Sequence, residues 1–345
     1  MPLTILAPST LQAQTLRRET TMRLQTEIDR SGLEVATGRL ADPYEALGRS
    51  ASRLLTLGAD LDRVENFLTS NGLLSGRLDA QEEALGRMRD IADEVMALSL
   101  PNRSGITPSS DDVQAMAMSA IRRITDLGNT VYGGRTLFSG VDTDNRAFSG
   151  WTEAGAGGTS IADEMAAILG AGPTNAADAA TMAAQVDALF GGTGYSDTLY
   201  RGAPATGPRL GARIGPEEDL QFGEQGDDPG FRDLMQGLAM IAALDTEGLS
   251  DAAYGEWMKA ATEKLSSGLE GVLGAETRTG IARGRVEEAV TALENRRDLY
   301  MSEQHKLEGV DPYAAASRFT ELESRLQASY AITARLSNLS FLNYM

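Results

Sequence analysis

The 345-residue sequence contains no cysteine and a single histidine, His305. Without cysteine there can be no disulfides, thiolate zinc sites or cysteine nucleophiles. One histidine excludes the two-histidine motif of HExxH metalloproteases and leaves one base for a Ser-His-Asp triad. His305 lies in the polar stretch 302–306, close to the end of an expected helix, where an exposed side chain is the simpler interpretation. We therefore expect neither a metal ion nor a cofactor.

Basic residues are also scarce, because 31 Lys and Arg stand against 49 Asp and Glu, for a formal net charge of −18. Nucleic acids and anionic membrane surfaces are bound by clustered cations, so neither is an expected partner. No run approaches the roughly 18–20 apolar residues of a membrane-spanning helix. The first residues lack the basic and long apolar regions of a cleaved signal peptide.

Motifs that would carry enzymatic chemistry are missing as well. The glycine-rich stretch 155–158 has neither the Gly-Lys-Ser/Thr ending of a phosphate loop nor the spacing of a dinucleotide turn. No Gly-x-Ser-x-Gly elbow occurs. The stretch 142–153 faintly resembles a calcium loop, but Arg146 and Ala147 stand where that loop needs an oxygen ligand and a glycine. The sequence predicts no enzyme.

Helical periodicity fills the first part of the chain. Residues 10–38 are expected to form a helix that ends at Gly38. From 44 to 99 apolar residues recur every three or four positions, and glycines at 72 and 76 interrupt the stripe and predict a kink or a junction between two helices. A loop and a shorter helix over 113–130 follow.

Helices return in the last third of the chain. A helical face resumes at Phe231, a long helix is expected over 251–307, and a final helix follows Asp311 and Pro312. Aspartate before proline recurs at Asp42 and Pro43, and this pair suits a helix N-cap followed by its first residue. Capping and the helix dipole also explain the acidic pairs 111–112 and 227–228.

The middle of the chain, residues 141–226, has a different character. It holds 15 of the 37 glycines and four of the 11 prolines. We interpret it as a separate small domain of strands, turns and one or two short helices. The predicted fold class is mainly α, with long antiparallel helical rods formed by the N- and C-terminal segments and a small inserted α+β or β outer domain.

The charge is distributed unevenly along the chain. Residues 1–30 hold four Arg and three acids, and residues 311–345 hold three of each, so nearly all the net negative charge falls between them. Near-neutral amphipathic ends suit segments buried among copies of the same chain. A plain antiparallel bundle with solvated acids explains the pattern equally well.

Four segments resemble those of flagellin-like proteins in order and spacing. They are Glu34–Pro43, with its Thr-Gly-Arg and Asp-Pro; Gly133–Gly140, with Thr-Leu-Phe-Ser-Gly; the re-entry Asp227–Leu234; and the ending Gln327–Met345, which is similar to that of flagellin-like hook-associated proteins of the hook–filament junction. The residues that carry the first two motifs are Thr37, Gly38, Asp42, Pro43, Leu137, Phe138 and Gly140. Ala41 stands where the family usually has a second aspartate.

The resemblance implies three regions. Residues 1–40 with 308–345 would be terminal helices, disordered in the monomer and lining an axial tube after assembly. Residues 41–140 with 227–307 would form a helical rod domain, and residues 141–226 an outer domain. Apolar side chains of the terminal helices would then contact other subunits, and those predicted to do so are Leu11, Leu24, Ile28, Phe319, Leu322, Leu326, Leu336 and Leu339.

The resemblance also implies a function and partners. The chain would be a structural component of the extracellular bacterial flagellum that joins a hook-side junction protein to the flagellin filament and templates filament assembly. Its partners would be further copies of itself in a ring, the hook-side junction protein, flagellin, an export chaperone and the flagellar type III apparatus, which exports without cleavage. A divergent flagellin and a cytoplasmic coiled-coil scaffold remain alternatives.

Overall fold

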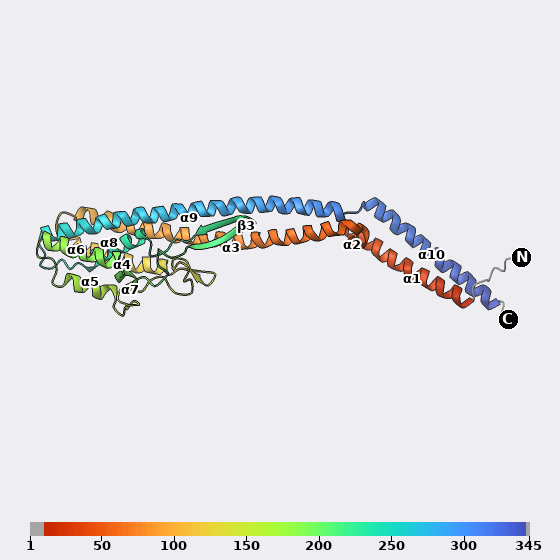
Figure 1. Cartoon of the computed structure of the whole chain (residues 1–345), viewed down its shortest axis with the longest axis horizontal. Coiled ribbons are helices and arrows are strands. Elements are labelled where there is room, and N and C mark those ends of the chain that lie inside the picture. The colour runs from red at the N-terminus through yellow and green to blue at the C-terminus, as the bar shows by residue number, and fades with distance from the viewer. Residues whose placement is uncertain (1–9, 343–345) are drawn as a thin grey trace. The chain divides into compact units, whose positions relative to one another are not determined.

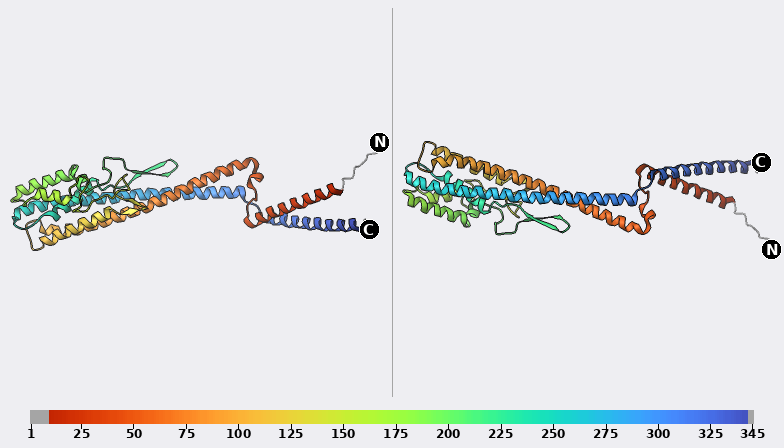
Figure 2. Two further views of the ribbon diagram at one scale, coloured as in Figure 1. Left: turned by 90° about the horizontal axis from the view of Figure 1, so that it is seen from below. Right: turned by 90° about the horizontal axis from the view of Figure 1, so that it is seen from above.

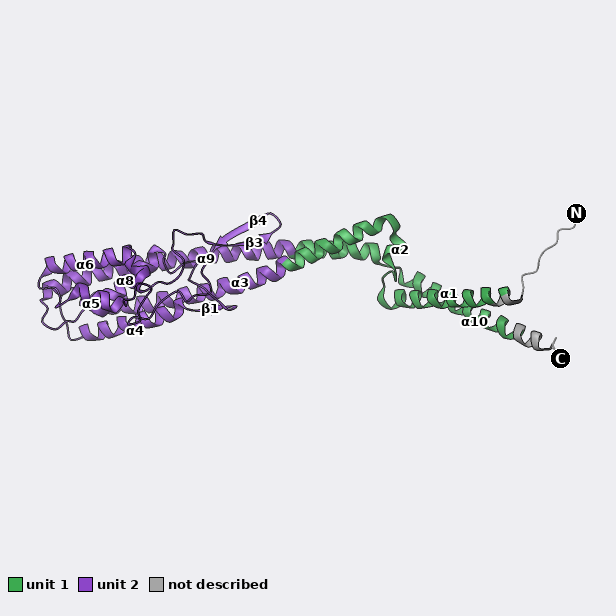
Figure 3. Cartoon of the chain, turned by 60° about the horizontal axis from the view of Figure 1, so that its bottom comes forward, with its two compact units in different colours: residues 1–66, 294–345 green, residues 67–293 purple. Residues whose placement is uncertain are grey.

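The computed structural model describes residues 10–342, without the side chains of 10, 11, 13, 14 and 336–342 (Figure 1). The chain divides into two compact units, coloured in Figure 3: residues 1–66 with 294–345, called unit 1, and residues 67–293, called unit 2. Long helices dominate the described part, and its two sheets are small antiparallel hairpins. The predicted mainly α class is confirmed.

Unit 1 is built from helices near both ends of the chain. Helix α1 (Thr10–Thr37) packs along α10 (Pro312–Leu342), and a short helix α2 (Pro43–Leu47) follows α1. The predicted end of the first helix is confirmed, because α1 stops at Gly38, whose φ of 68° is left-handed and suits glycine.

The two Asp-Pro pairs each start a helix of unit 1, as predicted. The side chain of Asp42 accepts a hydrogen bond from the backbone N–H of Glu45 over 3.0 Å, and Pro43 is the first residue of α2. Asp311 Oδ1 likewise accepts from the N–H of Tyr313 over 2.9 Å at the start of α10. Each aspartate satisfies amide groups that the helix leaves without a partner.

The connections that follow α1 and precede α10 are tied together. Arg39 and Gly309 form an antiparallel bridge. The N–H of Leu40 donates to the carbonyl of Glu308 over 2.8 Å, and the N–H of Val310 donates to the carbonyl of Gly38 over 3.1 Å. The turn at Gly38 therefore connects two distant parts of the sequence.

Two very long helices contribute residues to both units. Helix α3 (Ala51–Ser99) is continuous, so the kink predicted at Gly72 and Gly76 does not occur. Gly72 has open space around it, whereas Gly76 lies against the side chain of Tyr132. Helix α9 (Asp251–Glu308) matches the predicted 251–307, with the exposed His305 in its last turn.

Unit 2 surrounds its portions of α3 and α9 with shorter elements. In chain order these are η2 (Leu100–Asn102), α4 (Ser110–Gly128), β1 (Val131–Tyr132), β2 (Arg135–Thr136), α5 (Ile161–Leu169), α6 (Ala176–Gly191), α7 (Gly194–Thr198), β3 (Leu210–Gly215), β4 (Glu218–Phe222) and α8 (Pro229–Ala243). Strands β1 and β2 form one hairpin and β3 and β4 another. Figure 2 shows the β3–β4 hairpin beside the two long helices.

One apolar core runs through most of unit 2. Helix α8 is buried from Leu234 to Ala242, and it packs on α4 and α6. Trp257 of α9 is fully buried and donates its indole N–H to the carbonyl of Met240 over 2.8 Å. Side chains from the middle block, such as Met165 and Phe190, belong to the same core. The block thus has three helices and one hairpin, and it shares its core with the helices around it.

Glycines bring the backbones of α8 and α9 into direct contact. A Cβ added at Gly230 would lie 2.6 Å from the Cα of Gly271, and one at Gly237 would lie 2.6 Å from the backbone nitrogen of Leu265. Gly268 of α9 likewise lies directly against the backbone of Leu234. These positions tolerate no side chain at the present helix separation.

Candidate assembly surface

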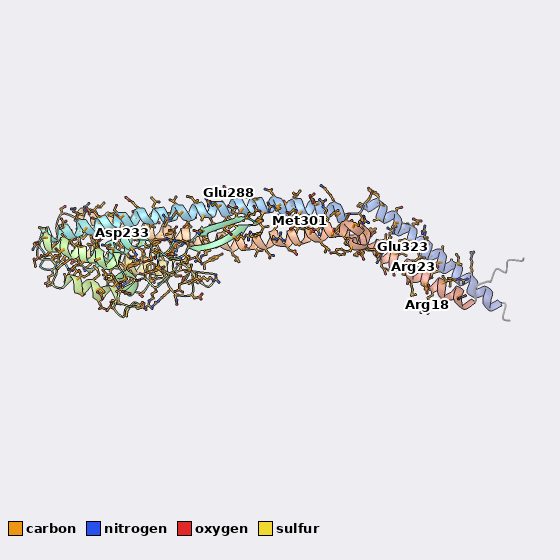
Figure 4. All side chains as sticks on the ribbon, in the orientation of Figure 1. Arg18, Arg23, Asp233, Glu288, Met301 and Glu323 are labelled. Carbon is orange, nitrogen blue, oxygen red and sulfur yellow. The ribbon has the colours of Figure 1, made fainter. Side chains whose placement is uncertain are left out.

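Most described side chains of the paired helices α1 and α10 of unit 1 are exposed. Figure 4 draws these side chains and labels Arg18, Arg23 and Glu323 among them. A hydrogen bond of 2.8 Å from Gln25 Nε2 to the hydroxyl of Tyr330 bridges the two helices. They carry most of the residues that the sequence predicted as intersubunit contacts.

An apolar seam joins α1 to α10. A Cβ at Gly32 would lie 3.3 Å from the ring of Phe319, and the buried Ser31 hydroxyl donates to the carbonyl of Ala315 over 3.4 Å. Leu322 is only 4% exposed. Because the helices are antiparallel, these contacts also bring Leu24 opposite Leu326.

The structure places the predicted contact residues on this seam. Leu24, Ile28, Phe319 and Leu326 are half-buried and Leu322 is buried, all within a single chain. The side chains of Leu11, Leu336 and Leu339 lie outside the described residues. Contact of these residues with other subunits stays a prediction, and in the isolated chain the described ones hold α1 to α10.

Large apolar side chains that the sequence analysis did not select are more exposed. The exposed fractions are 59% for Leu16, 52% for Met22, 51% for Leu33, 87% for Tyr313 and 56% for Ile332. In the sequence these residues can be found as apolar residues outside the helical apolar stripe. The residues of the stripe itself form the seam between α1 and α10. Such side chains are available to a partner, which makes them the better candidates for intersubunit contacts.

A polar hollow of about 380 Å³ opens where α1, α2 and α10 meet. Arg30 and Glu45 face each other across it in an ion pair of 2.9 Å. Glu34 accepts a hydrogen bond from the N–H of Ala41 over 3.3 Å, and Arg318 completes the wall. Opposite charges thus already neutralise much of this hollow.

The first family-like motif shapes the turn after α1. The hydroxyl of Thr37 donates to the carbonyl of Leu33 over 2.7 Å and accepts from the N–H of Arg39 over 3.3 Å. Gly38 then reverses the chain, and Asp42 with Pro43 starts α2. The motif residues act on local backbone geometry.

The second family-like motif is buried in unit 2. Leu137 and Phe138 are completely buried, and Phe138 meets Phe231 edge to face with ring centroids 5.6 Å apart. The carbonyl of Phe138 accepts from the N–H of Gly226 over 2.8 Å and from the hydroxyl of Tyr200 over 3.1 Å. Gly140, at φ 66°, ends the motif in a left-handed turn. This motif therefore anchors the re-entry segment that precedes α8.

The re-entry segment that precedes α8 comprises residues 224–228, which overlap the family-like stretch Asp227–Leu234. It holds three buried carboxylates, each paired with an arginine. Glu224 pairs with Arg278 (2.6 Å), Asp227 with Arg232 (2.6 Å) and Asp228 with Arg209. The sequence assigned Asp228 to capping, and that role is wrong for its side chain. Asp228 stands at the N-cap position, but its side chain accepts from the N–H of Gln225 over 2.9 Å and from no amide of α8. The half-buried Arg209 and the N–H of Gln225 take up its oxygens instead.

Two tyrosines close over the same segment. The hydroxyl of Tyr195 donates to the carbonyl of Gly226 over 2.7 Å, and the guanidinium of Arg232 lies 5.0 Å from the centre of its ring. Burial, reinforced by the negative charge of Asp227, raises the pKa of Tyr195 well above its ordinary value. The pKa of Tyr200 is raised for the same two reasons. Both hydroxyls serve as neutral hydrogen-bond donors within the core.

In the acidic loop with the faint calcium pattern, Asp142 and Glu153 bond to side chains of the same loop. Both carboxylate oxygens of Asp142 accept from Asn145 Nδ2 over 3.0 Å, and Glu153 pairs with Arg146. A hydrogen bond from the N–H of Gly150, then the Arg146 side chain, holds the pKa of Glu153 below its usual range. Within the described residues no three acidic or histidine side chains gather as a metal site would require. The same part of the chain has no helix with the length and apolarity to cross a membrane.

Comparison with protein families gives two matches. Residues 9–143 match the bacterial flagellin N-terminal helical region, and residues 263–345 match the bacterial flagellin C-terminal helical region. Together the two matched segments make up more than half of the chain. They include α1 and α10, whose seam defines the candidate assembly surface.

Comparison with solved structures gives matches from two bacteria. A Vibrio parahaemolyticus protein assigned as a flagellar hook-associated protein has 13% sequence identity and a TM-score of 0.51, and the match covers 75% of this chain and 97% of that one. FlgL of Bacillus cereus matches with 13% identity and a TM-score of 0.37, over 74% of this chain and 96% of its own. No curated protein matches the sequence.

Proposed function

This chain belongs to the flagellin family, and we propose that it is a structural subunit of the bacterial flagellum that joins a hook-side junction protein to the flagellin filament and templates the filament. The observation that carries this proposal is the pairing of α1 with α10, which leaves large apolar side chains exposed on both helices. Each Å² of apolar surface removed from water contributes about 25 cal/mol of free energy. This gain favours covering the exposed side chains with neighbouring subunits.

The flagellin-like ends support a place next to flagellin. A subunit whose two terminal regions are those of flagellin can present to the first flagellin copies the kind of surface that they present to one another. The fold shared with the hook-associated protein of Vibrio parahaemolyticus favours the junction role over that of a bulk filament subunit. The mechanism is therefore templating, with no chemical step.

The remaining partners follow from the same proposal. The subunit would form a ring with its own copies, contact the hook-side junction protein and flagellin, and reach the outside of the cell through the flagellar type III apparatus with an export chaperone. A cytoplasmic scaffold without a flagellar role does not fit a member of this family.

A divergent flagellin is the second candidate function, because both matched regions are described as those of flagellin itself. The two candidates differ in how the pure protein behaves. A filament subunit polymerises with itself into long filaments, whereas a junction subunit stops at a short assembly unless flagellin is supplied.

Deletion of the gene separates the candidates in cells. We expect hooks without filaments in electron micrographs and flagellin lost into the medium, with both reversed by the intact gene on a plasmid. Short or absent filaments with no flagellin-sized protein released would favour the filament subunit. Normal filaments after deletion, in a strain without a second copy, would overturn the proposal.

A further inference from the structure

The β1–β2 hairpin of unit 2 lies directly on helix α3. Tyr132 of the hairpin packs onto the backbone at Gly76, where a Cβ would overlap its hydroxyl group. The neighbouring Arg77 donates from Nη2 to the carbonyl of Thr136 over 2.8 Å. These two contacts hold the hairpin flat against one side of α3.

Arg77 is a buried cation without a counterion. Arg77 is only 9% exposed, and its Nε–H has no hydrogen-bond acceptor. Burial and the positive charge of Arg135 both lower the pKa of Arg77, so a second cation faces it where an acid would be expected. Among the described residues neither arginine forms an ion pair. A buried, uncompensated charge is costly, and a carboxylate supplied from outside the chain would reduce that cost.

Unpaired carboxylates lie at the tip of the other hairpin of unit 2. Glu217, Glu218 and Asp219, together called the acidic tip, are exposed and form no ion pair with any described residue. The hairpin that carries them is fixed to the long helices. Asn71 of α3 donates to the carbonyl of Ile214 over 2.8 Å, and Leu220 belongs to an apolar cluster with residues of α3 and α9.

The two hairpins lie at nearly the same level of α3 but on opposite sides. Asn71, which holds β3, is six residues before Arg77, or about 9 Å along the helix axis. Gly76 and Arg77 are rotated from Asn71 by about 140° and 240°, since each residue advances 100°. Figure 3 shows β3–β4 and β1 at opposite edges of the α3–α9 pair. The acidic tip thus lies on the other side of α3 from Arg77 and Arg135 of its own chain.

We propose that the acidic tip of one copy binds the arginine pair, Arg77 and Arg135, of a laterally adjacent copy of this chain. The inference rests on the proposed assembly of copies into a ring. Arg135, which is exposed, pairs directly with a carboxylate, and the buried Arg77 strengthens the attraction through its own charge. Complementary patches on opposite sides of a subunit form a heterologous contact, which repeats around a ring.

Charge complementarity identifies a second copy as the partner. The chain has a large excess of acids, yet neither the acidic tip nor the arginine pair forms an ion pair with a described residue. Arg213, opposite Asp219 in the β3–β4 register, donates instead to the carbonyl of Pro216. Side-by-side copies at the same height satisfy both patches at once. Matched opposite charges also fix the register between copies, because a wrong register leaves the buried cation uncompensated.

The absence of native cysteine allows a direct test by crosslinking. A strain that lacks the chromosomal gene produces two full-length variants with different tags, Arg135→Cys and Glu218→Cys. Isolated flagella are oxidised and run on a non-reducing gel. We expect a disulfide-linked dimer that carries both tags. The matched control replaces Arg135→Cys by Ile281→Cys, a 58% exposed position on α9, and should give no mixed dimer.

The outcomes keep this contact separate from the proposed function. Filaments that form with both cysteine variants but yield no mixed dimer would overturn the lateral contact and leave the junction role intact. If deletion leaves normal filaments, the junction role fails, and the same oxidation of the mixed purified variants still tests the contact. As a second readout, Arg135→Glu should prevent assembly, and adding Glu217→Arg and Glu218→Arg in the same chain should restore it. Assembly that persists in Arg135→Glu would contradict the proposal.

Discussion

The carboxylate of Asp228 and the guanidinium of Arg209 form a two-point ion pair at the entrance to α8, with Nη1 2.9 Å from Oδ2. Asp228 is also bonded to the N–H of Gln225, so one side chain fixes both the re-entry segment and the start of the β3–β4 region. The aspartate is 7% exposed and the arginine 34%. Breaking an ion pair with one buried partner costs more stability than breaking an exposed ion pair.

Replacing Asp228→Asn should therefore destabilise unit 2 by about 2 kcal/mol, below the range for a fully buried pair because Arg209 keeps contact with water. The measurement is urea unfolding followed by circular dichroism. Asp93→Asn, an exposed change on α3, is the matched control and should leave the midpoint unchanged. Equal midpoints for the two variants would contradict the structural role of Asp228.

Alanine at Gly268 should separate α8 from α9, because the new methyl group would meet the backbone of Leu234. We expect a loss of about 1–3 kcal/mol in the free energy of unfolding, as for other overpacked cores. Gly284→Ala, on the same helix but with open space around it, should stabilise by up to about 1 kcal/mol through helix propensity. Thermal unfolding of both variants tests the difference, and a shift in the same direction for both would argue against close helix contact.

Leu322→Ala should weaken the attachment of α10 to α1, since Leu322 is the most buried leucine of that seam. The expected cost is about 2 kcal/mol, at the lower end for leucine truncation because a helix pair can partly close over the gap. Faster amide hydrogen exchange in α1 would report it. Ile332→Ala, which removes an exposed side chain, should leave exchange unchanged.

Glutamate at Met22 and Ile332 together should abolish assembly while the monomer stays folded. Both side chains are exposed, so charge there would meet the apolar surface that subunits are proposed to share without entering the seam between α1 and α10. Helix content by circular dichroism and filament formation in a complemented deletion strain give the two readouts. Loss of helix content in the monomer would instead mean that these side chains serve an internal core.

Alkaline pH should unfold unit 2 through its buried tyrosines. The folded-state pKa of Tyr195 and that of Tyr200 are raised, first by burial and then by the charge of Asp227. Below the ordinary tyrosine pKa of about 10 both tyrosines are neutral in the folded and the unfolded state, and the folded state keeps its full stability. Above that pH the tyrosines of the unfolded chain ionise first, so the folded state loses stability as the pH rises. Thermal unfolding midpoints should therefore fall above about pH 10.

Tyrosinate absorbance checks this prediction directly. The signal of Tyr195 and Tyr200 should appear only together with loss of helix content, and Tyr313→Phe, at an exposed position, should not alter the alkaline unfolding. Ionisation of every tyrosine in a chain that keeps its helices would contradict the burial of these two hydroxyls.

The helices and their start signals could be predicted because they depend on local sequence. The Asp-Pro pairs at 42–43 and 311–312 act within one helical turn, and the stripe of the final helix has the helical period. The roles of Gly76, Arg77 and Asp228 could not be predicted, since each is decided by a residue far away in sequence: Tyr132, Thr136 and Arg209. The continuity of α3 was missed because glycine disfavours a helix in isolation, and tertiary packing outweighs that preference.

The intersubunit role of the candidate surface stays a prediction, and the structure adds which of its residues contact one another within the chain. The apolar stripes of α1 and α10 indicated contacts, and the structure uses Leu24, Ile28 and Leu322 for the seam between these two helices. A stripe in the sequence does not tell a partner within the chain from a partner outside it. The off-stripe side chains, such as Met22 and Tyr313, became informative only after the seam was known.

The pairing of residues 305 positions apart, Gln25 with Tyr330, makes the two ends of the chain depend on each other. Among the described residues, α1 makes its main helix–helix contact with α10. Removing either α1 or α10 therefore removes the same seam, and the seam cannot form before α10 has been synthesised. Unit 1 thus depends on two segments far apart in the sequence, whereas unit 2 comprises the continuous residues 67–293.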